Sequence, residues 1–228
     1  MMIQPLSSAL QKFFEQYPVK VYKKGEIILF QGEAPRVAYG VKKGVVKAYN
    51  LNSSGDEKPL GFFGPGSLFP GAWIFGKTPS AIYYYEALTD TELYGVPPSD
   101  YIDYLKQHPD ALFAELENYV ADDVGKTIRL NALQHSRASD KLIYTLHYLA
   151  LSHGRQLKPN VLEITLTLTH QDFANLTGLT RETTATELNK LKNLGVISYG
   201  KQTPYKINIA RLHDALNDQF IAELKLES

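Results

Sequence analysis

The chain has 228 residues, of which 44% are hydrophobic, and its 24 basic residues balance 24 acidic residues to a formal net charge of zero. This length and composition predict a folded protein with one large or two ordinary domains. The sequence has no cysteine and no apolar run near the roughly 18 to 20 residues of a membrane span, which excludes disulfides, thiolate-held iron–sulfur clusters and a membrane helix.

The sequence of the first 97 residues predicts one helix followed by many short strands. Its first residues lack the basic start and cleavage pattern of a signal peptide, so a cytoplasmic location is the simplest expectation. Residues 5–17 predict a short amphipathic helix with an apolar side of Leu6, Leu10, Phe13 and Phe14. Between residues 19 and 97, turn signals separate the runs VKVY, EIILF, VAYGVKKG, VVKAYNL, PLGFF, AIYYYEA and TELYGV. Such spacing predicts a small antiparallel β-barrel or jelly roll.

A metal-dependent enzyme of the cupin type is the alternative for such a barrel. Cupin metals need clustered histidines, but all six histidines follow the strand-rich region: His108, His135, His147, His153, His170 and His213. The barrel therefore offers no imidazole or thiolate ligand, and no pair of nucleophile and base is visible. We expect no catalytic residue, metal or cofactor, and we expect each histidine to lie at the surface or partly packed.

Two helices are predicted after the strands, the first over residues 98–107. The second begins at Pro109 and continues to about Ser136, with an apolar residue at every fourth position: Leu112, Leu116, Val120, Val124 and Ile128. Its length of about 40 Å exceeds what a small barrel needs for its own burial. We therefore expect this face to pair with a second copy of the chain; the alternative is a helix packed wholly inside one subunit.

A polar break at residues 135–140 precedes a further helix at 140–152. Ser139 is its expected N-cap, and its core face is Leu142, Ile143, Leu146, Leu149 and Ala150. Residues 161–168, VLEITLTL, alternate with period two and predict a strand. We place a domain boundary and a hinge at the break.

Residues 169–194 predict two short helices joined by a tight turn. Thr169 is a good N-cap three residues before Asp172, and Phe173, Ala174 and Leu176 form an apolar face. Gly178 can adopt the left-handed conformation that ends a helix, and Thr180 can cap the next one. The buried side of the second helix is expected to hold Leu188, Leu191 and Leu194.

The start of this second helix is polar, and we expect the following residues to face outward: Arg181, Glu182, Thr183, Thr184 and Thr186. A helix that reads base edges in the major groove needs several hydrogen-bonding side chains at its start, and this helix has them. The alternative is that the two helices are only a packing unit, as helix-turn-helix pairs can be. Strands at 196–199 and 205–209 around a turn at 200–204 add a wing. A last amphipathic helix is predicted at 210–225, with Leu212, Leu216, Phe220 and Leu224 on one side.

The balanced net charge means that phosphate binding must depend on local placement. The candidates are backbone amides at the capped helix starts and four lysines: Lys190, Lys192, Lys201 and Lys206. We expect modest affinity per half-site, which binding as a dimer would offset.

This order of elements resembles the cyclic AMP receptor / fumarate-nitrate regulator (CRP/FNR) family of bacterial transcription factors over nearly the whole chain. The resemblance is carried by Gly25-Glu26, Gln31-Gly32-Glu33, Gly44, Pro65-Gly66-Ser67-Leu68, Ala87-Leu88-Thr89-Asp90, Pro109-Asp110, Thr169-His170-Gln171-Asp172 and Leu179-Thr180-Arg181-Glu182-Thr183. It implies an α+β chain with a cyclic-nucleotide-binding-like jelly roll at residues 1–109, a dimerisation helix and hinge at 110–137, and a winged helix-turn-helix DNA-binding domain at 138–228. It also implies three partners: double-stranded DNA, a second copy of the chain and RNA polymerase.

The resemblance assigns roles to the helix pair. Arg181 would donate to guanine, Glu182 would accept from a cytosine amine, and phosphates would be held by threonine and glutamine side chains. The implied DNA-binding set is Thr169, His170, Gln171, Thr180, Arg181, Glu182, Thr183, Thr186, Lys190 and Lys201. Members that read a TGTGA half-site carry a second arginine where this chain has Thr186, so the half-site should differ at that base.

The effector pocket departs further from the family. Members that bind cyclic AMP use a Gly-Glu pair and an Arg-Ser pair, but the corresponding places here read Pro70-Gly71 and Pro79-Ser80. No arginine occurs between Arg36 and Arg129, so a buried phosphate would lack its bidentate partner. The effector is therefore expected to be a small apolar or aromatic molecule, or absent from a filled barrel. The candidate pocket residues are Phe69, Gly71, Trp73, Ser80, Tyr83, Tyr85, Thr127 and Arg129.

The sequence thus predicts a homodimeric transcriptional regulator, not an enzyme, on a two-fold symmetric operator. An effector would act by favouring one setting of the hinge. The alternative is a binding or scaffolding protein whose winged helix contacts protein rather than DNA.

Overall fold

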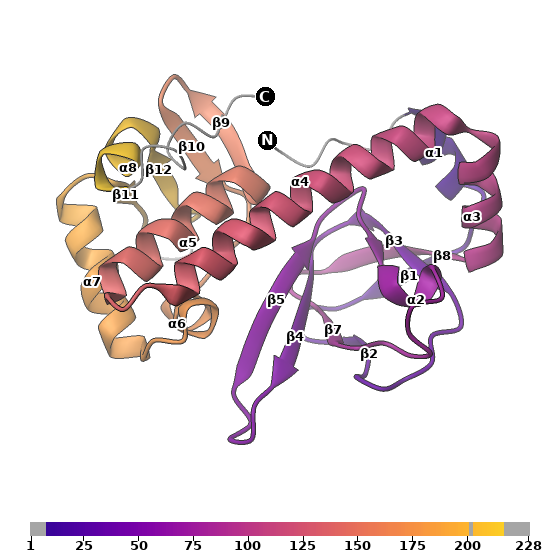
Figure 1. The fold of residues 1–228 in the computed structure, drawn as a ribbon, viewed down its shortest axis with the longest axis horizontal. Coiled ribbons are helices and arrows are strands. Elements are labelled where there is room, and N and C mark those ends of the chain that lie inside the picture. The colour runs from indigo at the N-terminus through magenta and orange to yellow at the C-terminus, as the bar shows by residue number, and fades with distance from the viewer. Residues whose placement is uncertain (1–7, 201–202, 217–228) are drawn as a thin grey trace. The chain divides into compact units, whose positions relative to one another are not determined.

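The computed structural model describes residues 8–200 and 203–216. The chain divides into two compact units, one ending at Glu117 and the other beginning at Asn118. This division falls within a continuous helix, α4 (Pro109–Gln134), which is labelled in Figure 1. The domain boundaries after residues 109 and 137 stay predictions.

Eight strands in two antiparallel sheets form the body of the N-terminal unit. The sheet orders are β1-β8-β3-β6 and β2-β7-β4-β5. The strands are β1 (Val19–Tyr22), β2 (Ile27–Leu29), β3 (Ala38–Lys43), β4 (Val46–Leu51), β5 (Glu57–Phe63), β6 (Leu68–Phe69), β7 (Tyr84–Ala87) and β8 (Thr91–Val96). Each predicted run contains a strand. Strand β6 was not predicted, because it has only two residues and gives no alternating pattern.

The alternation of side chains along the strands builds the core of this unit. Val46 and Ala48 of β4 and Tyr85 and Ala87 of β7 belong to one buried cluster, whereas the residues between them project to the other face of the sheet. Figure 1 shows β4 and β5 as a long hairpin. The predicted antiparallel two-sheet architecture is confirmed.

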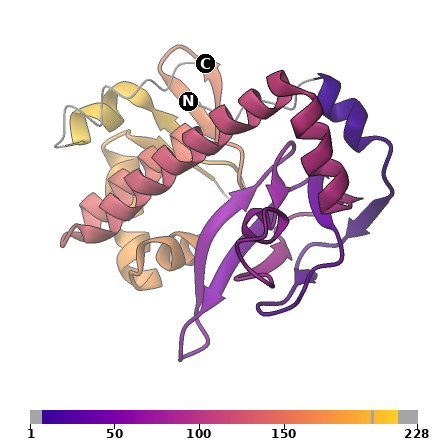
Figure 2. The same cartoon turned by 45° about the vertical axis from the view of Figure 1, so that its right-hand side comes forward.

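Short helices cover one end of the two sheets. They are α1 (Ser8–Phe14), α2 (Gly71–Ile74) and α3 (Pro98–Gln107). Figures 1 and 2 show α1 and α3 side by side, where Phe13 stacks on Tyr104 with ring centroids 4.3 Å apart. The first helix ends at Phe14, earlier than the predicted residue 17, because residues 15–17 form a turn before Pro18; residues 5–7 lie outside the described chain.

The apolar residues predicted on α4 do not form one continuous seam. Leu112, Leu116 and Val120 are 48%, 52% and 51% exposed, but Ile128 is only 5% exposed and Val124 is half-buried. A step of four residues turns by about 40° round a helix of 3.6 residues per turn, so four steps turn by about 160°. Ile128 therefore lies on a different side from Leu112 and is buried within the chain.

Five of the exposed apolar residues of α4 follow a different spacing. Leu112, Leu116 and Tyr119 are separated by steps of four and three residues, and the same alternation reaches Leu130 and Leu133 after two charged positions, Asp123 and Lys126. This alternation keeps side chains on one side of a helix. We call these five residues the α4 stripe, and all of them are exposed.

The C-terminal unit is built round α5 (Ala138–His153), in which every residue from Leu142 to Leu151 is buried. Helix α5 is followed by β9 (Gly154–Lys158), β10 (Val161–Ile164), α6 (His170–Thr177), α7 (Arg181–Asn193), β11 (Ile197–Ser198), β12 (Lys206–Asn208) and α8 (Ile209–Ala215). It packs against α6, α7 and α8 and against β9 and β10. The strands form one antiparallel sheet of order β11-β12-β10-β9.

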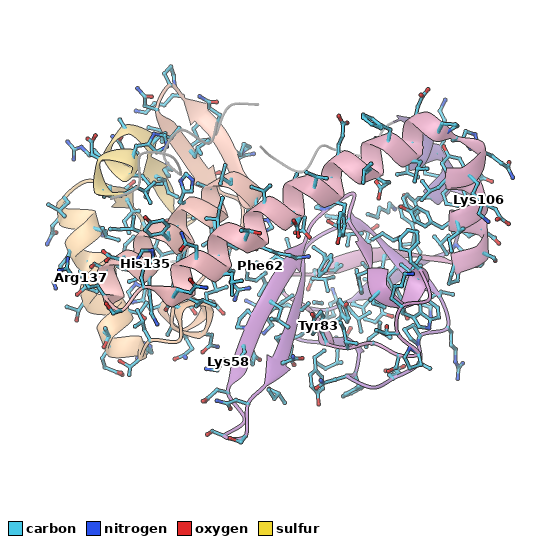
Figure 3. The ribbon with its side chains drawn as sticks, in the orientation of Figure 1. Lys58, Phe62, Tyr83, Lys106, His135 and Arg137 are labelled. Atoms are coloured by element: carbon cyan, nitrogen blue, oxygen red, sulfur yellow. The ribbon has the colours of Figure 1, made fainter. Side chains whose placement is uncertain are left out.

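Some boundaries in this unit differ from the sequence prediction. The N-cap of α5 is Arg137, labelled in Figure 3, whereas the Ser139 hydroxyl lies inside the helix and donates to the Asp140 carboxylate. Strand β10 ends at Ile164, four residues before the predicted end, and the backbone N–H and the hydroxyl of Thr165 both donate to the His153 carbonyl oxygen. Strand β9 is an additional element that was not predicted.

The C-terminal helix begins one residue earlier than predicted. Asn208 caps α8 by accepting from the backbone N–H of Arg211 at 3.1 Å. Of its predicted apolar side, Leu212 and Leu216 are buried, and Phe220 and Leu224 lie outside the described residues. No helix in the described part of the chain is long and apolar enough to cross a membrane.

Candidate nucleic-acid interface

The start of α6 is closed by a capping box. The Thr169 hydroxyl oxygen accepts from the backbone N–H of Asp172 at 3.2 Å, and the Asp172 carboxylate accepts from the backbone N–H of Thr169 at 2.7 Å. Two of the N–H groups that a helix start leaves without partners are thereby satisfied. The predicted cap is confirmed, and it sets the position at which α6 begins.

The turn between α6 and α7 depends on one glycine and one threonine. Gly178 ends α6 in the left-handed conformation, with φ of 69° and ψ of 21°. Thr180 then caps α7, because its hydroxyl oxygen accepts from the backbone N–H of Thr183 at 3.1 Å. With only Leu179 between them, these two residues set the geometry of the helix pair.

The faces by which α6 and α7 pack are mostly as predicted. Phe173, Ala174 and Leu176 of α6 are buried, as are Leu188 and Leu191 of α7. These side chains, together with α5, form the core beneath the helix pair.

Two residues of α7 behave differently from the prediction. Thr184, expected to face outward, is fully buried, because it precedes Leu188 by four residues and so shares its face. Leu194, expected to be buried, is 66% exposed. It follows the last helical residue, and Gly195 with φ of 69° turns the chain away immediately after it.

The other predicted DNA-binding residues lie at the start of α6 or along α7. His170 at the start of α6 is half-buried, and the remainder are exposed: Thr169, Gln171, Thr180, Arg181, Glu182, Thr183, Thr186 and Lys190. Lys201 lies outside the described residues. The structure therefore brings these nine described residues onto one helix pair.

Electrostatics link the two helices at this surface. Partial burial, and then the positive charge of Arg181, lower the pKa of the His170 imidazole below its ordinary value. His170 is therefore mostly neutral at pH 7 and contributes little positive charge in the free protein. Lys190 forms an ion pair with Glu187 at 2.7 Å, but both Lys190 and Arg181 remain exposed and able to meet a phosphate or a base.

The wing contains a residue whose role the sequence analysis missed. Strands β11 and β12 pair as Ile197 with Ile207, and Tyr199 follows β11 directly. The Tyr199 hydroxyl donates to Asn189 of α7 at 3.1 Å, while its ring lies 4.6 Å from the Tyr205 ring. Tyr199 thus joins the wing to the helix pair.

Lys192, one of the predicted phosphate-binding lysines, contacts the same residue. Its ammonium group lies 4.6 Å from the centre of the Tyr199 ring and donates to the Tyr199 carbonyl oxygen at 3.1 Å. The His170 ring meets the Tyr199 ring edge-on at 5.6 Å. An aromatic residue just before a wing turn, with lysine and asparagine on the preceding helix, is the only sequence signal for this contact.

The predicted effector residues do not all lie in one cluster. Phe69 is fully buried and stacks on Tyr85 at 4.8 Å, and Tyr83, labelled in Figure 3, packs against the same cluster. Trp73 instead packs against a second cluster, with α1 and α3. Gly71 and Ser80 lie at the start of α2 and in the loop before β7.

The two helical residues of the predicted pocket belong to the C-terminal unit. Thr127 is exposed. Arg129 is buried, with its guanidinium carbon 6.0 Å from the centre of the Tyr148 ring, and burial lowers its pKa. Within the N-terminal unit, the Phe69 ring packs against the rings of Tyr39, Phe63 and Tyr85.

One histidine differs from the expectation of surface or partial packing. His147 is fully buried on α5, with its ring 6.0 Å from that of His213 on α8. It lies among the consecutive buried residues of α5, a helix surrounded on all sides. Across residues 8–200 and 203–216, no group of three or more histidine, aspartate or glutamate side chains could hold a metal ion.

A two-sheet barrel, a long helix and a capped helix pair with a wing are the parts of a helix-turn-helix transcriptional regulator. Residues 19–108 match the family described as "Cyclic nucleotide-binding domain", and residues 140–215 match the "Crp-like helix-turn-helix domain". The chain belongs to the CRP/FNR family of transcriptional regulators.

Similar proteins carry the same assignment. The HTH-type transcriptional regulator ArcR of Staphylococcus epidermidis is 30% identical over 80% of this chain and 79% of its own. The cyclic AMP receptor protein of Thermus thermophilus is 27% identical over 81% of each chain. A solved structure of a CooA mutant from Carboxydothermus hydrogenoformans shares the fold with a TM-score of 0.73 at 19% identity, covering 92% of this chain and 95% of the other.

We expect the Tyr199 ring to stabilise the wing more than its hydroxyl does. Tyr199→Ala should lower the free energy of unfolding by about 2 kcal/mol, because it removes the ring packing and the cation–π contact. Tyr199→Phe keeps both and should cost less than about 1 kcal/mol. Urea denaturation of the two variants measures the difference; equal costs would assign the role to the hydroxyl bond with Asn189 instead.

Proposed function

We propose that this chain is a homodimeric regulator that binds a two-fold symmetric operator through its paired helix-turn-helix units. The observation that supports this most directly is the exposed start of α7. Arg181 and Glu182 are the first two residues of α7, and both are exposed. Thr180 caps this end of the helix, and the opposite, buried face of α7 packs against α5. A polar, exposed and capped helix start fits a major groove.

Phosphate binding relies on the same local geometry. Both helices begin with threonine caps, and the remaining N–H groups of each first turn can donate to a phosphate oxygen. Lys190 and Lys206 are exposed and can add positive charge. Because few cations are available, each half-site binds modestly, and a dimer is needed for tight binding.

The dimer forms through the α4 stripe. Its leucines and Tyr119 are exposed, and a helix whose apolar stripe keeps to one side can pair with a second copy of itself. Exposed apolar side chains repeated along one helix are unusual on the surface of a protein that acts alone. The symmetry of the pair would match the symmetry of the operator.

The effector is not a cyclic nucleotide. The matched barrel family takes its name from cyclic nucleotides, but a shared fold does not carry the ligand with it. This barrel has no arginine from residue 37 to 117, and the aromatic rings round Phe69 leave an apolar interior. A small apolar or aromatic molecule, or no ligand, fits this interior better. Any signal would act through residues 135–137, which connect α4 to α5.

Selection from random duplexes should enrich a two-fold symmetric sequence. Arg181→Ala and Glu182→Ala should each weaken binding about 5- to 150-fold and relax the preference at one base pair, since a base contact is worth about 1–3 kcal/mol. Lys190→Ala is the matched control, because the loss of a phosphate contact weakens all sequences equally. The proposal fails if no sequence is enriched at low salt and both variants bind as the wild type does.

Interruption of the α4 stripe should break the dimer. Leu116→Glu places a charge among apolar side chains, so the particle should fall from twice the 25.6 kDa chain mass to the chain mass itself. Lys106→Glu, on α3 and labelled in Figure 3, introduces the same carboxylate away from the stripe and should leave the mass unchanged. Sedimentation equilibrium measures both; a wild type of single-chain mass would contradict the dimer.

Cyclic AMP and cyclic GMP should leave the melting temperature unchanged. A ligand at one hundred times its Kd stabilises a protein by about 2.7 kcal/mol, which would appear as a shift of several degrees. Thermal denaturation with each nucleotide at millimolar concentration tests this. A clear stabilisation by either one would show that the barrel binds a buried phosphate without an arginine.

A further inference from the structure

The exposed face of α7 changes character after its first turn. Arg181 and Glu182 are followed four residues later, on the same side of the helix, by Ala185 and Thr186. Thr186 is exposed and Ala185 is half-buried. A polar pair is therefore followed by a pair of short side chains, each ending in a methyl group.

Thr186 has no hydrogen-bond donor left to offer a base. Its hydroxyl donates to the carbonyl oxygen of Glu182, four residues earlier in α7, at 3.0 Å. A hydroxyl has a single proton. What Thr186 presents outward is therefore a methyl group, with only an acceptor oxygen beside it.

In the next turn of α7, polar groups contact neighbouring side chains. The Asn189 side-chain oxygen accepts from the Tyr199 hydroxyl at 3.1 Å, which holds this amide toward the wing. The Lys190 ammonium group donates to Glu187 at 2.7 Å. After the first turn of α7, which holds Arg181, Glu182 and Thr183, the next side chains on this face are thus the methyl pair.

We propose that the methyl group of Thr186, with Ala185 beside it, reads the 5-methyl group of a thymine in each half-site, at the base pair next to the one that Glu182 contacts. In the major groove only thymine presents a methyl group, and alanine and threonine methyls are its usual apolar partners. A guanine at this position would present two acceptors to methyl groups, which cannot donate a hydrogen bond. The inference rests on the proposed function, and it names the base that the operator carries there.

Deoxyuridine provides the test, since it differs from thymidine in a DNA duplex only by the missing 5-methyl group. With the full-length protein and the selected operator, each thymine of the half-site is replaced by deoxyuridine in turn. At one position, wild-type binding should weaken about fourfold, which corresponds to about 0.8 kcal/mol for one buried carbon. A competition mobility shift measures each ratio.

Matched variants assign the effect to Thr186. Thr186→Ser removes only the methyl group and should abolish the difference between thymine and deoxyuridine at that position, whereas Thr186→Val keeps a methyl group and should retain it. Thr165→Ser removes a methyl group from an exposed threonine outside the predicted DNA-binding set, and it should also retain the difference. Thermal melting of each variant confirms that it folds.

The outcomes separate this inference from the proposed function. If no duplex is enriched, both are overturned. If an operator is enriched but deoxyuridine is tolerated at every thymine, or the penalty persists in Thr186→Ser, only the methyl contact is overturned. A loss of binding in Thr186→Val with no thymine preference in the wild type would show that the hydroxyl oxygen accepts from a base amine, which also contradicts the proposal.

Discussion

The turn between α6 and α7 is the constraint on which the candidate interface depends. Gly178 can hold its φ of 69° without a Cβ clash, and Thr180 begins the next helix two residues later. If α7 began one residue earlier or later, its face would rotate by about 100° and Arg181 would point elsewhere. The caps at Thr169 and Thr180 therefore determine which side chains reach outward.

This turn is held in place from both sides. Below it, α5 is buried along its whole middle and packs against both helices, so the pair cannot shift without opening the core of the unit. Beside it, Tyr199 links the wing to α7, and its neighbour Tyr205 meets Phe173 of α6 at 4.9 Å. The wing and the helix pair thus share one aromatic contact and behave as one rigid surface.

Local signals in the sequence were sufficient for the caps of α6 and α7 and for the turn between them, because these depend on residues three or four apart. The errors came from features that depend on distant packing. Thr184 is buried because of where α5 lies, and Leu194 is exposed because α7 has already ended. Tyr199 could not be assigned a role, since its partners come from two other elements.

The apolar repeat of α4 shows that the position of each residue round the helix axis matters as much as its residue type. Every fourth residue from Leu112 to Ile128 is apolar, yet that series winds round the helix and ends in the buried core. The alternation of four and three, which includes Tyr119, Leu130 and Leu133, keeps to one side. One side of α4, with Ile128, is buried within the chain, and another side, the α4 stripe, is apolar and exposed, so the helix has two separate apolar surfaces. Only the second surface is available to a partner, so burial and self-association need not compete for the same residues.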